Sequence, residues 1–124
     1  MKYIFSFLIS SILLVSCESG GRNKKETKEE DITLNPDYEP GLTLVARNKC
    51  LTCHSITETI TGPPYREIAK KYAGMSDTIV SHLANKIISG GMGVWGQIFM
   101  TPHPDLSKKD AETMVRYILL LGKQ

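Results

Sequence analysis

The sequence has no large excess of charge of either sign. Its 124 residues contain 15 lysines and arginines and 13 aspartates and glutamates, which gives a formal net charge of +2. No basic block of the kind that binds nucleic acid stands out, and so we expect no nucleic-acid partner. Internal repeats are also absent, and the length suits one domain with one modest core.

The chain offers no apolar run at its N-terminus long enough to cross a membrane as a helix. The run from Tyr3 to Val15 is shorter than the roughly twenty apolar residues that a spanning helix needs. It has the length of the apolar core of a secretory signal, and it ends in the letters LVSC, which resemble the bacterial lipobox. We therefore interpret residues 1–16 as a lipoprotein signal peptide and Cys17 as the site that receives a diacylglycerol. An ordinary signal with an incidental cysteine is the alternative.

Few apolar residues occur between Cys17 and Pro36. The segment ESGGRNKKETKEEDITLN is dominated by charged residues of both signs and by small residues, which leaves it little to bury. We therefore predict a flexible tether over residues 17–35 and a folded domain over residues 36–124. A flexible chain of this size holds a domain on the order of 25 Å from its anchor.

The folded part shows no convincing strand, whereas apolar residues recur at helical spacing. Tyr65, Ile68, Ala69 and Tyr72, for example, fall on one helical face. Four short helices make a thin core for this many residues, so something else is expected to fill the centre. The predicted helices run from about Pro40 to Lys49, from Pro63-Pro64 to Tyr72, from the N-cap Ser76 to Gly90, and from the N-cap Ser107 to Gly122.

The segment CLTCH, Cys50 to His54, indicates what fills the centre. Two cysteines three residues apart, followed at once by histidine, form the attachment signature of c-type haem. Two thiolates on one helical turn can form thioethers with the two vinyl groups at one haem edge. The adjacent His54 then lies under the iron, and its ring nitrogen becomes the proximal ligand. The export signal strengthens this interpretation, because covalent haem attachment is completed outside the cytoplasm in bacteria.

Other uses of the cysteines lack the residues that they need. A structural zinc site requires two ligands beyond Cys50 and Cys53, and the histidines His54, His82 and His103 stand at no zinc-finger spacing. A thioredoxin-like redox pair needs a βαβ setting, which the sequence does not offer. A disulfide between the two cysteines would leave His54 unexplained. We therefore predict one covalently attached haem c per chain.

Residues 36–124 resemble the class I cytochromes c, of the small monohaem type that carries electrons in bacterial respiratory chains. CLTCH is similar to the haem-binding motif, and TGPPYREIAKKYAG to the Gly-Pro segment and short helix that follow it. GVWGQIFMTPHP and LSKKDAETMVRYILLL resemble the family's segment that carries the ligand methionine and its C-terminal helix. The resemblance implies an all-α cytochrome c fold, with four short helices around the haem and the first and last helices crossing. Lys49 departs from the family, which often has glycine before the first cysteine.

The resemblance also implies roles for individual residues. His54 is the proximal ligand, and the carbonyl of Pro63 accepts the other imidazole N–H, which fixes the tautomer. Trp95 donates its indole N–H to a haem propionate, and a core tryptophan without such a bond is the alternative.

Met92 and Met100 are the candidates for the distal iron ligand, since Met75 is expected at the surface and Met114 in the core. Met92 stands between two glycines, whereas Met100 is followed two positions later by a proline that restricts the backbone. In the family the ligand methionine follows the Val-Trp-Gly segment, which also favours Met100. His103 is the alternative, a nitrogen ligand.

These features predict an electron-transfer protein rather than an enzyme. Iron with histidine and methionine ligands has no free site for a substrate, and methionine raises the reduction potential relative to a second histidine. We expect a carrier in the bacterial cell envelope, anchored through acylated Cys17, with its domain facing the periplasm or the cell exterior. Its expected partners are the lipid membrane and redox proteins, namely a membrane donor and a terminal oxidase or reductase.

Two other functions fit the same motifs. One is a haem gas sensor or a peroxidase-like protein with an open distal site. The other is a fixed electron-entry subunit of a larger oxidase or reductase.

Overall fold

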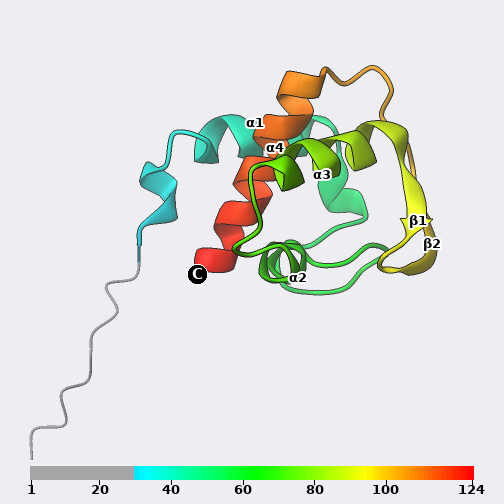
Figure 1. The fold of residues 1–124 in the computed structure, drawn as a ribbon, viewed down its shortest axis with the longest axis horizontal. Coiled ribbons are helices and arrows are strands. Elements are labelled where there is room, and N and C mark those ends of the chain that lie inside the picture. Colours follow the sequence, from blue (N-terminus) through cyan, green and yellow to red (C-terminus); the bar gives the residue numbers. More distant parts are fainter. Residues whose placement is uncertain (1–29) are drawn as a thin grey trace, which may run out of the picture.

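The computed structural model describes residues 30–124, a mostly helical structure with one small sheet (Figure 1). The predictions for residues 1–16, for Cys17 and for the tether as far as residue 29 fall outside the described residues. The elements, with η for a short 3₁₀ helix, are η1 (Ile32–Leu34), α1 (Tyr38–Arg47), η2 (Cys50–Thr52), α2 (Tyr65–Lys71), α3 (Thr78–Ser89), β1 (Gly91–Gly93), β2 (Gly96–Met100), α4 (Lys108–Leu120) and η3 (Leu121–Lys123).

Helices α1 and α4 cross at the centre of the core, as expected for the first and last helices (Figure 1). Gly41 of α1 is buried against α4, and a β-carbon there would overlap the β-carbon of Tyr117. The close approach lets Tyr38 meet Tyr117 edge to face, with ring centroids 5.4 Å apart. Val45 and Met114 are buried in the same cluster, which confirms the core position predicted for Met114.

Helices α2 and α3 also pack against α4 and complete the helical frame. Tyr65 and Ala69 of the predicted α2 stripe are buried, and so are Ala84 and Ile87 of α3. Within residues 30–124, every helix is too short or too polar to cross a membrane. The frame is therefore the four-helix arrangement that the periodicity predicted.

The helix starts agree with the prediction at α4 and differ at α3. Ser107 caps α4, because its hydroxyl accepts the Asp110 N–H at 3.1 Å and donates to the Asp110 carboxylate at 2.8 Å. Ser76 does not cap α3, since the N-cap residue is Asp77. The Ser76 hydroxyl instead forms a 2.7 Å hydrogen bond with the hydroxyl of Thr78. The Ser76 hydroxyl is therefore bonded to a neighbouring side chain and not to an N–H group of the helix.

Packing begins before the predicted boundary at residue 36. Ile32 of η1 is only 1% exposed and belongs to the core cluster. Helix α1 likewise begins at Tyr38, ahead of the predicted start at Pro40. One isoleucine in a charged stretch has no periodic pattern, so the sequence offered no signal for this contact.

The chain between α3 and α4 contains a small antiparallel sheet, so the prediction of no strand was wrong. Strands β1 and β2 pair with Gly91 opposite Met100 and Gly93 opposite Gly96. Three of these four positions are glycine, which removes the alternation of side chains from which strands are predicted. The pairing returns Met100 to the end of α3. The two strands lie at the opposite side of the view from η1 (Figure 1).

Candidate functional site

The two cysteines lie in a tight turn directly after α1. The carbonyl of Cys50 accepts the N–H groups of Cys53 at 3.2 Å and of His54 at 3.0 Å. Both thiols are free, with Cys50 half-buried and Cys53 exposed. Burial raises the pKa of the Cys50 thiol, because the charged thiolate is disfavoured away from water. One turn of chain therefore presents two thiols and an imidazole in succession.

Lys49, the departure from the family pattern, adopts the backbone conformation that glycine usually provides. Its φ is 56°, and among residues 30–124 it is the one non-glycine residue in the left-handed region. Its N–H donates to the carbonyl of Ala46 at 3.0 Å, which closes the end of α1. The chain thus turns toward Cys50 as it would with glycine, at a strain of about 1–2 kcal/mol.

His54 is held through its Nδ1 atom, which lies 2.8 Å from the carbonyl oxygen of Pro63. A carbonyl only accepts, so Nδ1 carries the proton and donates it. The lone pair of the neutral ring then lies on Nε2, the atom left to bind a metal. The ring of Tyr65 stacks on the imidazole, with centroids 5.3 Å apart and planes 20° from parallel. The predicted contact with Pro63 is therefore present, while ligation by His54 stays a prediction.

The loop after Cys53 folds back to bring Pro63 to His54. The carbonyl of Cys53 accepts the Gly62 N–H at 2.8 Å, which closes the loop. Gly62 lies against the imidazole, and a β-carbon there would come within 2.5 Å of the His54 Cε1 atom. The sequence indicated the Gly-Pro segment but not this contact. The glycine directly before Pro63 was the available signal.

The two candidate methionines have different surroundings. Met100, at the end of β2, is half-buried and packs against the core cluster. A β-carbon on Gly90 would overlap the Met100 carbonyl oxygen, so α3 and β2 are in close contact there. Met92 of β1 is 50% exposed, and Met75 is exposed as predicted. Met100 therefore has the more constrained position of the two candidates.

His103, the alternative ligand, lies in the loop between β2 and α4. Its main-chain N–H donates to the carbonyls of Ile87 at 3.2 Å and Ile88 at 3.0 Å. Its side-chain Nδ1 is buried and has no hydrogen-bond partner within residues 30–124. An imidazole with an unused nitrogen therefore lies near Met100 in the chain.

Trp95 lies at the tip of the β1–β2 hairpin and is 43% exposed. Its propionate role and the alternative of a core tryptophan both stay predictions. The side-chain nitrogen of Lys71, at the end of α2, lies 5.4 Å from the centroid of the Trp95 ring. An indole donor and a cation thus stand close together, which suits a carboxylate ligand. The sequence gives no signal for Lys71, because a lysine in the last turn of a helix is common.

Large apolar side chains are exposed chiefly in two segments, residues 51–60 and 92–99. These site segments hold eight of the ten exposed large apolar residues among those described, and the eight are Leu51, Ile56, Ile60, Met92, Val94, Trp95, Ile98 and Phe99. Exposed apolar groups in such number indicate a ligand or partner that covers them. Because the same segments adjoin the thiols, the imidazole and both candidate methionines, the residues fit a covalently held haem.

Residues 38–122 match the model of the Cytochrome c family. The chain belongs to the cytochrome c family. The match runs from α1 to η3 and includes both site segments. The cofactor is therefore one covalently bound haem c per chain, and this cytochrome is an electron-transfer protein rather than an enzyme.

Individual cytochromes agree with the family match. Cytochrome c-552 of Nitrosomonas europaea is 41% identical over 78 residues, which cover 63% of this chain and 75% of that protein. Cytochrome c-551 of Azotobacter vinelandii is 41% identical over 81 residues, 65% of this chain and 96% of that one. The crystal structure of wild-type Nitrosomonas europaea cytochrome c552 aligns with a TM-score of 0.60 at 40% identity, covering 64% of this chain and 98% of that chain. The predicted cytochrome c fold is confirmed.

Proposed function

We propose that this cytochrome is a membrane-tethered carrier that moves single electrons between respiratory redox partners. The observation that carries the proposal is that both candidate iron ligands have constrained positions. The Pro63 carbonyl fixes the imidazole of His54, and the core and Gly90 surround Met100. Two fixed ligands fill the coordination of a haem iron, which suits a carrier and leaves no site for a substrate.

In this proposal Cys50 and Cys53 would hold the haem through two thioether links, and Nε2 of His54 and the sulfur of Met100 would bind its iron. Bound haem supplies an iron that alternates between the ferric and ferrous states. The chain fixes the ligands around it: the Pro63 carbonyl holds the proton on Nδ1 and makes Nε2 a stronger ligand. A methionine ligand favours the ferrous state relative to a second histidine.

Trp95 binds a haem propionate in the same proposal. Its exposed position at the hairpin tip leaves the indole N–H available for a ligand. Lys71 beside its ring adds a positive charge, which favours a carboxylate over a neutral acceptor.

Absorbance spectra with and without carbon monoxide test the carrier proposal. The spectrum of the reduced, purified holoprotein should change little when carbon monoxide is added, because His54 and Met100 would already bind the iron. An immediate spectral shift would instead identify an open distal site, as in a gas sensor or a peroxidase-like protein. The spectrum of the oxidised protein should also contain the weak near-infrared band of methionine–iron ligation.

The anchor and the location outside the cytoplasm rest on the sequence of the first 17 residues. We propose that Cys17 is acylated and that the domain faces the periplasm or the cell exterior, within reach of a membrane donor and a terminal oxidase or reductase. The variant Cys17→Ser should fail to be processed or should leave the membrane on detergent partitioning. A variant that partitions and migrates like wild type would refute the lipoprotein interpretation. Recovery of stoichiometric oxidase or reductase subunits from gently solubilised membranes would identify a fixed subunit instead of a carrier.

A further inference from the structure

We propose that Lys108 fastens the methionine loop, residues 100–107, to helix α3 and is thereby a positioning residue for Met100. The role of Met100 as ligand belongs to the proposed function, and this inference rests on it. The methionine loop leads from the end of β2 to the start of α4. It contacts Gly90 just after α3 and the last turn of α3, and Lys108 directly after it also reaches α3.

The first attachment is at Gly90, where α3 ends. Gly90 has a φ of 65°, and a β-carbon there would overlap the Met100 carbonyl and lie 2.8 Å from the nitrogen of Pro102. Only a residue without a side chain allows this approach in that backbone conformation. The contact fixes the start of the methionine loop by shape.

The second attachment uses carbonyl groups that a helix leaves without partners at its C-terminal end. The N–H of His103 donates to two of them on α3, at 3.2 Å to Ile87 and 3.0 Å to Ile88. The middle of the methionine loop is thus tied to the helix by one N–H group. A single shared donor of this kind opens easily unless the chain on both sides of it is held.

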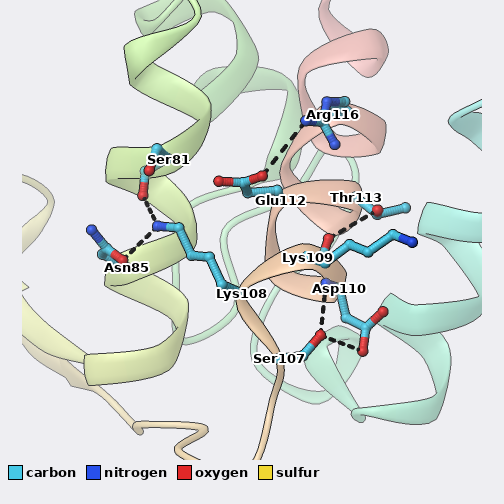
Figure 2. A network of polar contacts seen from close by, with 9 residues as sticks. All are labelled: Ser81, Asn85, Ser107, Lys108, Lys109, Asp110, Glu112, Thr113 and Arg116. Carbon is cyan, nitrogen blue, oxygen red and sulfur yellow. Dashed lines mark hydrogen bonds and ion pairs between the residues drawn. The ribbon is translucent and has the colours of Figure 1, made fainter.

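Lys108 supplies the third attachment, at the first residue of α4. Its side-chain nitrogen donates to the carbonyl of Ser81 at 2.6 Å and to the side-chain oxygen of Asn85 at 2.5 Å (Figure 2). Both acceptors lie on α3, and the lysine forms no ion pair within residues 30–124. A cation at the N-terminal end of a helix is unfavourable for the helix dipole, so local helix stability does not explain this lysine.

The neighbouring Lys109 provides a matched control. It carries the same charge in the same helical turn, but Figure 2 shows its side chain pointing away from Ser81 and Asn85. Lys109→Met therefore removes the same charge as Lys108→Met and leaves the contact with α3 intact. Lys108→Arg keeps a cation with N–H donors and serves as the conservative rescue variant.

Two measurements on the holoprotein test the proposal. Hydrogen exchange by NMR reports how often the His103 N–H leaves α3, and the near-infrared band in increasing guanidinium chloride reports when methionine leaves the iron. Lys108→Met should speed exchange at His103 about tenfold, and the band should disappear at a lower denaturant concentration than the far-ultraviolet circular dichroism of the helices. Lys109→Met should match wild type in both measurements, and Lys108→Arg should recover most of the protection.

Equal shifts of the band and of the helical signal in Lys108→Met would overturn the proposal, because Lys108 would then stabilise the whole fold. Unchanged exchange at His103 would overturn it as well. A wild-type spectrum without the near-infrared band would refute Met100 as ligand and with it the positioning role. The exchange rate at His103 would still decide whether Lys108 fastens the methionine loop.

Discussion

The helical frame buries its apolar side chains, whereas the two site segments expose theirs. In the frame, Val45 and Ala84 are completely buried, because periodic stripes on neighbouring helices face one another. In the site segments, Ile98 is 62% exposed and Phe99 is 56% exposed. The chain therefore supplies one part of its core through helix packing, and haem is the group expected to cover the other part.

Loss of both haem attachment points gives the largest expected effect. In the double variant Cys50→Ala and Cys53→Ala, the site segments lose the covalent group on which their apolar side chains depend. We expect little stable protein, as for small domains that depend on a bound metal. The measurements are the yield of soluble protein and circular dichroism on heating. A haem-free domain that melts cooperatively would show that the helical frame is sufficient by itself.

Replacement of the candidate ligands gives the next largest effect and is confined to the site segments. Met100→Ala should open the iron to carbon monoxide, lower the reduction potential and abolish the near-infrared band. Met92→Ala should change little, because that side chain is half exposed.

Two outcomes of that experiment would change the ligand assignment. Loss of the band in Met92→Ala alone would reverse the roles of the two methionines. A six-coordinate spectrum with a nitrogen ligand in both variants would identify His103, and the carrier would then work at a lower potential.

A change in the helical frame should have a moderate effect of a different kind. Gly41→Ala places a β-carbon against Tyr117 and 2.9 Å from the Thr113 carbonyl oxygen, so α1 and α4 must separate. Overpacking of this sort costs about 1–3 kcal/mol of unfolding free energy. Denaturant unfolding should show this loss while the haem spectrum stays that of wild type. The exposed position Thr43 on the same helix is the control, and Thr43→Ala should change stability by much less.

The smallest expected effect lies where the frame meets the site. Lys49→Gly removes left-handed strain beside Cys50 and adds the flexibility of glycine to the unfolded chain, with a net stabilisation of about 1 kcal/mol. Denaturant unfolding of the holoprotein measures it, and Lys49→Ala, which keeps the strain, is the control. A destabilised glycine variant would mean that the lysine side chain contributes more than its backbone strain costs.

Part of the site could be predicted because the groups that attach the haem are consecutive in the sequence. CLTCH identifies the haem attachment without any tertiary information, since the thiols and the imidazole act over one turn of chain. The helices of the frame were predicted for a similar reason, because an apolar stripe has the period of the helix that buries it. The β1–β2 hairpin was not, because glycines at its paired positions leave no alternating pattern.

The sequence alone determined that this chain attaches haem and that four helices form its frame, because each conclusion depends on residues close together in the chain. It also favours Met100 as the distal ligand, which stays a prediction. The tertiary structure alone decided that Ile32 belongs to the core, that Gly62 lies against His54, that Lys71 stands beside Trp95, and that Lys108 reaches across to α3. These contacts join residues that no local pattern connects. Which residues meet in this way depends on how helices and loops pack in space. The spacing of apolar residues along the sequence does not indicate that packing.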